Sequence, residues 1–537
     1  MKKKFWFALT RFLIVGALLS AWSVAPAAQR DRLIIGIPAF PPSADQDMAS
    51  HPMQWLLTFY TASWAFEAPR ALGGFPGAED VSVPIYGWSQ PRNFESWGVS
   101  EDGLTWTFRI RPGNMSYYGN EFTTEDIKWS HERIFGNNFI MMFFWGVGGL
   151  GDLESSFKII DKYTYTLTTE KPNPVLNAIM RIDPYMRFDA TEAKKHATAD
   201  DPWANEWIRT HGTSGFGPWV IDEWVPGDRV TLLANPNYAG GKPKIDKLIL
   251  VVIPESANRL AAIKDGTIDL AIDLSPEQIL SLEGAEGVRT LALPLTMHTW
   301  GVMNNSRAPF DNKLVRQAMN FAMPKEAICD TAYLGFAKPW RAALPEVFPA
   351  ATGPEEFPYS FDLDKAKALL DEAGYSDGFE MELIYDSSFQ PWETAATMIR
   401  TTLAKIGVTV NIRSMPAGPF TSAVNGKEFH FALWHDMPIL SDPNYGMNLS
   451  YKTGAFVNYA GYSNPEVDSM LEEGMSILDT TERLAHHRDI QRIVLDDAPI
   501  VFAWNESFLR AIRSDIRGLE WVDGGKLQPS KMYFIGD

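Results

Sequence analysis

The stretch from Phe379 to Ile412, FEMELIYDSSFQPWETAATMIRTTLAKIGVTVNI, decides the fold class of this chain. Apolar residues recur at every second position over 379–385, as they do in a strand with one buried face. Over 393–406 they recur at helical spacing, and Gly407 suits the end of such a helix. Alternation returns over 408–412, so the stretch predicts a strand, a helix and a second strand parallel to the first. This βαβ unit predicts an α/β fold with a parallel or mixed sheet.

Strands and helices alternate over the rest of the chain as well. Residues 33–37 and 247–253 are apolar runs typical of buried strands, whereas 105–110 alternate between polar and apolar. No internal repeat or low-complexity linker separates these elements, so we expect two α/β lobes joined by several crossing strands. Helices are predicted to begin at three polar capping positions, namely Thr123 or Thr124, Asp311 and Asp362.

The composition excludes several classes of protein. Hydrophobic residues make up 45% of the 537 positions, which is too many for a disordered chain. A net charge of −18 argues against general nucleic-acid binding, which needs a basic face. The single cysteine, Cys329, excludes a disulfide framework and a multi-cysteine metal site, and we expect it to be a small buried residue.

The N-terminus has the pattern of a secretory signal peptide over residues 1–27. Three lysines at positions 2–4 precede an apolar stretch from Phe12 to Val24, and Ala25-Pro26-Ala27 offers small residues for cleavage. The alternative is a retained N-terminal anchor. Cleavage removes four basic residues and no acid, which takes the net charge from −18 to −22. No cysteine lies at the cleavage site, so the mature protein is expected to be exported, soluble and not a lipoprotein.

The segment from Trp97 to Ser130 carries a resemblance to a known family. It contains WGVSEDGLTWTF at 97–108, RIRPG at 109–113 and FTTEDIKWS at 122–130. The segment resembles the bacterial extracellular solute-binding proteins of the oligopeptide, dipeptide and nickel type, family 5, and the likeness extends over about residues 33–505. Other matching segments are GFGPW at 215–219, PGDRV at 226–230, NPNY at 235–238, GKPKID at 241–246, RLAAIKDGTID at 259–269, VRQA at 315–318, DKAKALL at 364–370 and DAP at 497–499.

The resemblance implies a two-lobed periplasmic-binding-protein fold of type II, with an extra subdomain in lobe I and a ligand cleft between the lobes. It also implies a monomer in the periplasm that delivers its ligand to the permease subunits of an ABC transporter in the inner membrane, without nucleic acid. The crossings between the lobes are expected near 297–300 and 500–504. The expected division is 28–60, 200–297 and 503–537 for the lobe I core, 61–199 for the extra subdomain and 298–502 for lobe II.

Two loops of lobe II are the candidate ligand site, because ligands of open α/β sheets bind beyond the carboxyl ends of the strands. One loop runs from Asp386 to Trp392, and the other starts at His435 after a strand predicted over 429–434. In peptide-binding relatives, an aspartate that closely follows a tryptophan grips the amino group of the ligand. Here Trp434 and Asp436 fit that order, although the spacing to the following Asp442-Pro443 is about two residues longer.

The first loop departs from the pattern of the dipeptide binders, which carry an arginine there for the ligand carboxylate. This chain has Asp386 at or near that place, with Ser387 next to it, and an aspartate cannot grip a carboxylate. A dipeptide is therefore a poor candidate ligand, and two acids without a basic partner suit hydroxyl-rich or cationic ligands. Structural roles remain open: Asp386 or Ser387 as a helix cap, and Asp436 as a turn residue.

Tryptophans extend the candidate site, since their faces stack on sugar rings, guanidinium groups and peptide side chains. Trp434, Trp392, Trp340 and Trp64 lie near predicted loops or strand ends, and each also suits a place in the core. We expect no cofactor and no metal site. His435 alone makes no metal site, and the adjacent His486 and His487 are expected to be a solvated pair.

These observations favour capture of an oligopeptide-like solute, with an oligosaccharide or other polyhydroxyl or cationic ligand as the main alternative. A glycoside-cleaving enzyme is a distant alternative, with Asp386 and Asp436 as its carboxylate pair. The sequence contains no Gly-x-Ser-x-Gly elbow, His-Glu-x-x-His helix or P-loop, so we expect no enzymatic activity. An exported chaperone-like or adhesive module is a third class.

Overall fold

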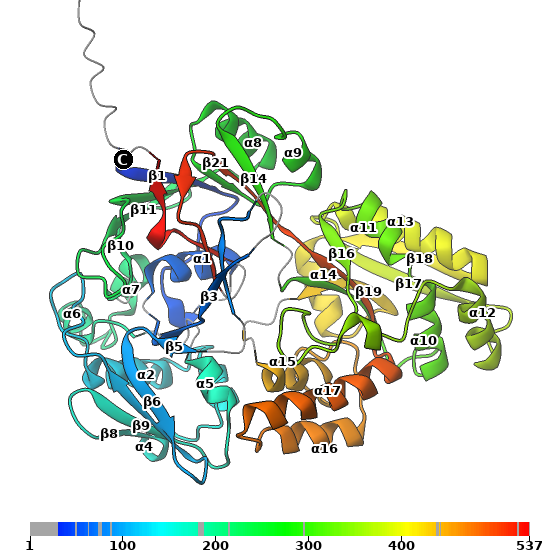
Figure 1. The fold of residues 1–537 in the computed structure, drawn as a ribbon, viewed down its shortest axis with the longest axis horizontal. Coiled ribbons are helices and arrows are strands. Elements are labelled where there is room, and N and C mark those ends of the chain that lie inside the picture. The colour runs from blue at the N-terminus through cyan, green and yellow to red at the C-terminus, as the bar shows by residue number, and fades with distance from the viewer. Residues whose placement is uncertain are drawn as a thin grey trace, which may run out of the picture.

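Two large β-sheets, one of seven strands and one of six, form the framework of the molecule. Figure 1 shows the six-stranded sheet with its helices on one side of the molecule and the seven-stranded sheet on the other. The predicted signal peptide lies outside the residues described. The computed structural model describes residues 30–48, 51–62, 64–73, 78–85, 89–180, 187–212, 215–293, 296–436, 440, 442–522 and 526–535.

The seven-stranded sheet combines distant parts of the chain. Its centre is parallel, since β1 pairs with both β12 and β13 in the parallel sense. The buried strands predicted over 33–37 and 247–253 are confirmed as its β1 and β12. The strands in spatial order are β10 (Trp219–Val225), β11 (Arg229–Ala234), β12 (Lys247–Val252), β1 (Arg32–Ile37), β13 (Leu270–Ile272), β21 (Phe508–Arg513) and β14 (Val288–Leu293).

The six-stranded sheet contains the βαβ unit that the sequence predicts. Strands β17 and β18 pair in parallel from Phe379 opposite Val408 to Asp386 opposite Met415, and α13 (Pro391–Leu403) connects them. Gly407 has a φ of 87°, the left-handed conformation that glycine adopts without a Cβ clash. The strands in spatial order are β16 (Ala337–Pro339), β20 (Ile500–Glu506), β15 (His298–Met303), β19 (Phe431–Asp436), β17 (Phe379–Asp386) and β18 (Val408–Met415).

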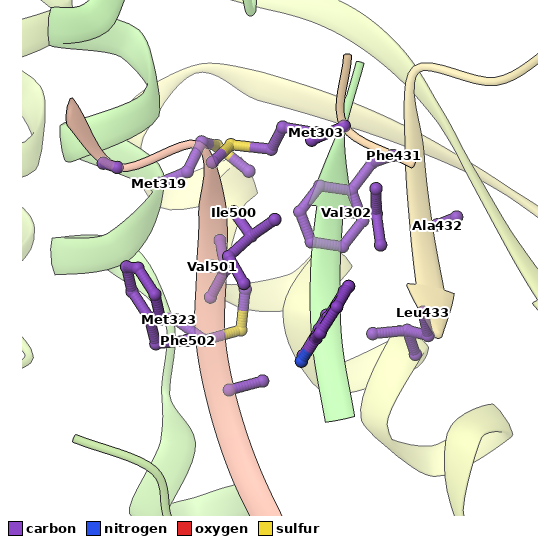
Figure 2. Packing of buried hydrophobic residues seen from close by; sticks show 14 of the residues in the cluster. Val302, Met303, Met319, Met323, Phe431, Ala432, Leu433, Ile500, Val501 and Phe502 are labelled. Carbon is purple, nitrogen blue, oxygen red and sulfur yellow. The ribbon is translucent and has the colours of Figure 1, made fainter. Parts of the chain in front are cut away.

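A large apolar core lies on this six-stranded sheet. Figure 2 shows Val302 of β15, Phe431 of β19 and Phe502 of β20 side by side across three neighbouring strands, with Met319 and Met323 approaching from the side of α10 (Lys313–Ala322). Cys329 is buried in the same core, as predicted, and burial raises the pKa of its thiol to about 12.

Most of the predicted helix starts are confirmed. Thr123 caps α2 (Thr124–Asn137), and its own backbone N–H donates to the carboxylate of Asp126 at 2.8 Å. Asp362 caps α12 (Leu363–Glu372). The third prediction is wrong by one residue, because the side chain of Asn312 rather than Asp311 caps α10.

A third sheet of four strands lies beside the seven-stranded sheet and carries its own apolar cluster. This cluster also includes Leu440 and Tyr445, of which Tyr445 belongs to α15 (Pro443–Tyr451), an element of the six-stranded half. Residues of α5 (Val175–Ile179) belong to the same cluster, and Figure 1 shows this helix between the third sheet and α15. Its strands are β6 (Phe94–Val99), β7 (Thr105–Ile110), β9 (Thr164–Thr168) and β8 (Phe157–Ile159).

The chain passes between the two large sheets twice. One passage lies between Leu293, which ends β14, and His298, which begins β15. The other is Ser507 alone, because β20 ends at Glu506 and β21 begins at Phe508. The predicted boundary at 502 thus lies inside β20, whose last residues still pair with β15 of the six-stranded sheet. Within the described ranges, no helix combines the length and apolar character that a membrane crossing requires.

Candidate functional site

The strand registers bring the predicted ligand residues to one edge of the six-stranded sheet. Strands β17 and β19 are parallel with Ile384 opposite Ala432, so their carboxyl ends meet at that edge. The antiparallel β15 places His298 opposite both Asp436 and Asn505. Both passages to the other sheet also leave from this edge, since β15 begins there and β20 ends there.

The opposite sheet presents its corresponding edge to the same passages. Strands β13 and β14 both pair antiparallel with β21, so their carboxyl ends lie where β21 begins, directly after Ser507. The two carboxyl edges therefore face each other across the two passages. This is the position that open α/β sheets use for ligands.

Strand β19 lies two residues further along the chain than the strand predicted over 429–434, so the prediction is wrong at both ends. The strand begins at Phe431 and continues through His435 to Asp436. The polar residues stay in the ladder because β15 supplies backbone partners as far as His298. Asp436 is therefore the last residue of a paired strand rather than a turn residue, and its side chain is partly exposed. Met437 and Pro438 of the predicted loop lie outside the described residues.

His435 joins the two predicted loops through ring contacts. Its ring lies 5.0 Å from Phe389 and 5.1 Å from Trp392, measured between centroids. Trp434 lies on the neighbouring position of the strand, 4.9 Å from Tyr459 and 5.7 Å from Phe420. Trp434 and His435 are each partly exposed, whereas Trp392 is only 1% exposed and supports His435 from the core.

Several polar atoms at this edge have no hydrogen-bond partner within the described ranges. They are Nε1 of Trp434, Nδ1 of His435 and Oδ1 of Asn505. Buried polar groups are nearly always satisfied in native proteins, by protein, water or ligand. Such groups at the ends of neighbouring strands make this edge a candidate site for a ligand that carries hydrogen-bond donors and acceptors.

The electrostatics of this edge favour a positive or neutral polar ligand. Burial lowers the pKa of His298 to about 3, so its ring is neutral at physiological pH and its Nδ1–H donates to the carbonyl of Thr296 at 3.0 Å. Burial, and then the nearby Asp436 carboxylate, raises the pKa of the hydroxyls of Tyr445 and Tyr459. Asp436 is thus a negative charge beside neutral aromatic groups.

Asp386 and Ser387 lie at the same edge, at the end of β17. The Asp386 carboxylate accepts hydrogen bonds from the backbone N–H of Ser388 at 2.9 Å and from its hydroxyl at 2.7 Å. These bonds form a turn, and the following α13 has no side-chain cap. Asp386 is partly exposed and Ser387 is exposed, so both remain accessible to a ligand.

Trp340 and Trp64 lie in two different places. Trp340 is fully buried in the six-stranded half, with its ring 4.2 Å from that of His298. Trp64 is 7% exposed and belongs to a small apolar cluster with Phe59 and Val522, with the Arg92 guanidinium 5.2 Å from its ring. The structure thus groups Trp340 with the strand-end residues and leaves Trp64 in a separate cluster.

An arginine hydrogen-bonds the backbone at the carboxyl edge of the seven-stranded sheet. Arg259 of α8 (Ser256–Asp265) is 3% exposed and donates its N–H groups to backbone carbonyls at the ends of β12 and β13. Nε donates to Ile272 at 3.0 Å and Nη2 to Asp273 at 2.8 Å. Nη1 donates to Ile253 and Pro254, each at 2.7 Å.

The predicted solvated histidine pair is wrong for one member. His487 in α17 (Thr480–Asp497) is fully buried and hydrogen-bonded to the side-chain oxygen of Asn444, and burial lowers its pKa to about 3. His486 is partly exposed on another face of the helix. In the part of the chain that the structure describes, no three His, Cys, Asp or Glu residues gather as a metal site would require.

Sequence reasoning missed His298, Asn505 and Tyr459 as members of this edge. His298 and Asn505 come from strands whose pairing partners lie more than a hundred residues away, so only the register reveals them. The polar pattern at the end of the apolar run 500–506, Asn505 followed by Glu506, was the one available signal.

Comparisons with known proteins agree with this architecture. The model of the bacterial extracellular solute-binding proteins, family 5, matches residues 90–458. The chain belongs to this family. Its fold is that of the two-lobed periplasmic binding proteins, whose ligand cleft lies between the lobes, and the facing sheet edges of this solute-binding protein occupy that place.

Individual relatives are distant but cover nearly the whole chain. A probable D,D-dipeptide-binding periplasmic protein of Escherichia coli is 27% identical over 526 residues, 96% of each chain. A glutathione-binding protein of Pectobacterium atrosepticum is 27% identical and covers 79% of this chain and 82% of its own. Among solved structures, the substrate-binding protein CtaP of Listeria monocytogenes has a TM-score of 0.80 at 22% identity and covers 94% of this chain and 99% of its own.

Proposed function

We propose that this protein is the periplasmic substrate-binding component of an ABC importer, which captures a peptide-like solute and delivers it to permease subunits in the inner membrane. Residues 1–27 are the signal peptide that directs its export, and the mature protein acts as a monomer that binds its solute without chemical change. Its lobes are the units built on the two large sheets, with 61–199 as a subdomain of the first.

The observation that carries the choice of ligand is the position of Asp436. This carboxylate ends strand β19, is partly exposed, and lies near Tyr445 and Tyr459 at the carboxyl edge of the sheet. A ligand ammonium group would form charge-assisted hydrogen bonds with it in a partly desolvated place, where such bonds are strong. The relatives named for binding a D,D-dipeptide and glutathione support a peptide-like ligand with a free amino group.

In this proposal the other predicted residues contribute to ligand binding to different extents. Trp434 and His435 offer unpaired polar atoms beside Asp436, and Trp392 and Trp340 hold His435 and His298 in place from the core. Asp386 and Ser387 form a secondary contact, because two hydrogen bonds already engage the Asp386 carboxylate. Trp64 contacts the solute from the lobe I side.

Native mass spectrometry of the protein as purified is the first test, since it identifies any solute that remains bound. Tryptophan fluorescence titrations then compare short peptides with the same peptides acetylated at the amino group. We expect acetylation to weaken binding at least about tenfold, because it removes the charge that Asp436 recognises. Equal binding of the two forms would overturn the assignment of Asp436. Binding of cello-oligosaccharides together with failure of all peptides would favour the oligosaccharide alternative.

A further inference from the structure

A cavity of about 360 Å³ lies in the six-stranded half, and its lining contains none of the predicted ligand residues. Its walls come from the end of α10, the start of α11 (Lys325–Thr331) and the segment 354–361. Its lining includes the apolar side chains of Met323, Phe357 and Phe361 and also polar and charged residues, among them Glu326 and Arg341. Lys325 lines the cavity as well, although the residue is only 5% exposed.

The Lys325 amine is poorly compensated for a buried cation. Its Nζ donates to the carbonyl of Trp340 at 3.4 Å and lies 4.3 Å from the centre of the Phe357 ring. An ammonium carries three N–H donors, and no carboxylate oxygen of the described residues lies within ion-pair distance of this one. The neighbouring Glu326 pairs with Arg341 instead, at 3.0 Å at the surface. A buried cation without a counter-charge is costly.

The charged and titratable groups around this amine do not remove that cost. Burial, together with the smaller effect of Arg341, lowers the pKa of Lys325 to about 7, and Glu326 and Cys329 oppose the shift only in part. Across the cavity, the Tyr359 hydroxyl donates to the carbonyl of Leu495 at 2.6 Å and supplies no anion. Besides the paired Glu326 and Arg341, the cavity therefore offers apolar and aromatic side chains and one cationic donor, Lys325, that has no carboxylate partner among the described residues.

We propose that this cavity is a second ligand site, separate from the solute site, which takes a small monocarboxylate with an apolar or aromatic body. The carboxylate supplies the counter-charge that the Lys325 amine lacks, and the body packs against Phe357 and Met323. A single negative charge matches a single unpaired cation, whereas a dianion would leave one charge against apolar walls. The proposal does not depend on the identity of the transported solute.

Calorimetric titration of the mature protein with phenylacetate tests this site. We expect binding by the wild type, and affinity that falls about tenfold for each pH unit above 7, because only the protonated amine pairs with the anion. The neutral analogue phenylacetamide is expected to bind at least about tenfold more weakly, since it cannot form the charged pair. Affinities that are equal at pH 6 and pH 9, or equal for the two compounds, would overturn the proposal.

The variant Lys325→Met removes the charge and keeps the length of the side chain. We expect it to abolish phenylacetate binding while Lys338→Met, which removes an exposed lysine of the adjacent strand β16, leaves binding unchanged. The fold should tolerate Lys325→Met. Because the pKa of Lys325 is depressed on folding, protonation of this amine opposes folding at pH 6, and the variant should melt no lower than the wild type there.

Two further results separate the sites. Asp436→Asn should leave phenylacetate affinity unchanged, which would place the two ligands in different sites. Loss of phenylacetate binding in Asp436→Asn, with retention in Lys325→Met, would instead assign the compound to the solute site and overturn the proposal.

Discussion

The carboxyl edges of the two large sheets face each other but differ in how their polar groups are hydrogen-bonded. On the seven-stranded sheet, Arg259 donates hydrogen bonds to four backbone carbonyls at the ends of β12 and β13, so these carbonyls already have a partner within the protein. On the six-stranded sheet, Trp434, His435 and Asn505 leave polar atoms unpaired beside the Asp436 carboxylate. The comparison supports the proposal that the second edge, rather than the first, carries the groups that recognise the solute.

Replacing Arg259 should have the largest effect on stability, because this side chain hydrogen-bonds the backbone carbonyls at the edge of the seven-stranded sheet. Arg259→Met removes four hydrogen bonds to backbone carbonyls, one buried and three partly buried, and we expect a loss of about 3–5 kcal/mol in the free energy of unfolding, measured by urea denaturation. Arg209→Met, which removes an exposed arginine, is the control and should change it by less than about 0.5 kcal/mol. An unchanged urea midpoint for Arg259→Met would refute the description of this edge as held by the arginine.

The opposite edge should respond in binding rather than in stability. Asp436→Asn keeps the shape of the side chain and removes its charge, so we expect solute affinity to fall roughly 10- to 100-fold with little change in the melting temperature. Fluorescence titration with the solute found by native mass spectrometry measures this. Asp377→Asn is the matched control, since Asp377 is exposed at the amino end of β17, on the far edge of the same sheet. Equal losses of solute affinity in both variants would contradict a specific role of Asp436 in recognising the solute.

Acid should destabilise the recognition edge through His298. The folded-state pKa of about 3 lies below the usual value of 6.5, so the stability that this neutral ring contributes is present above pH 6.5 and is lost as pH falls towards 3. Between pH 7 and 4.5 we expect His298→Phe to lose about 2 kcal/mol less stability than the wild type. His211→Asn, at an exposed histidine, should match the wild type. Parallel pH profiles for all three proteins would contradict the buried neutral ring.

The smallest effect is expected at Asp386. Its carboxylate already accepts two hydrogen bonds from Ser388, so Asp386→Ala should cost about 1 kcal/mol of stability and weaken solute binding no more than about threefold. Chemical denaturation and the same titration measure both quantities. A loss of affinity as large as that of Asp436→Asn would make Asp386 a principal contact and would favour a ligand with two cationic or hydroxyl-rich ends.

Local patterns predicted the elements of this fold better than their ends. The strands predicted from the alternation over 379–385 and 408–412 and the helix between them are confirmed. A single buried face determines each strand, and a glycine in the left-handed region ends the helical segment. The end of β19 was missed because His435 and Asp436 are polar, and only pairing with β15 keeps them in the strand.

The candidate site was only partly predictable for a related reason. Asp436 and Trp434 follow from their place after an apolar strand, but His298 and Asn505 enter through antiparallel pairing with distant strands. Burial was equally hidden, because a tryptophan near a predicted loop has the same pattern whether it is a ligand platform or core. Trp340, which follows β16, is fully buried, while Trp434 on β19 is partly exposed.

The join between β20 and β21 has a consequence for the order of folding. Residues 500–506 fill an interior position of the six-stranded sheet, and 508–513 fill an interior position of the seven-stranded sheet between β13 and β14. Neither sheet can close until this last segment of the chain has been synthesised and has found both sites, across sequence separations that make pairing slow. The two sheets are therefore expected to complete their folding together, once residues 500–513 have paired in both of them.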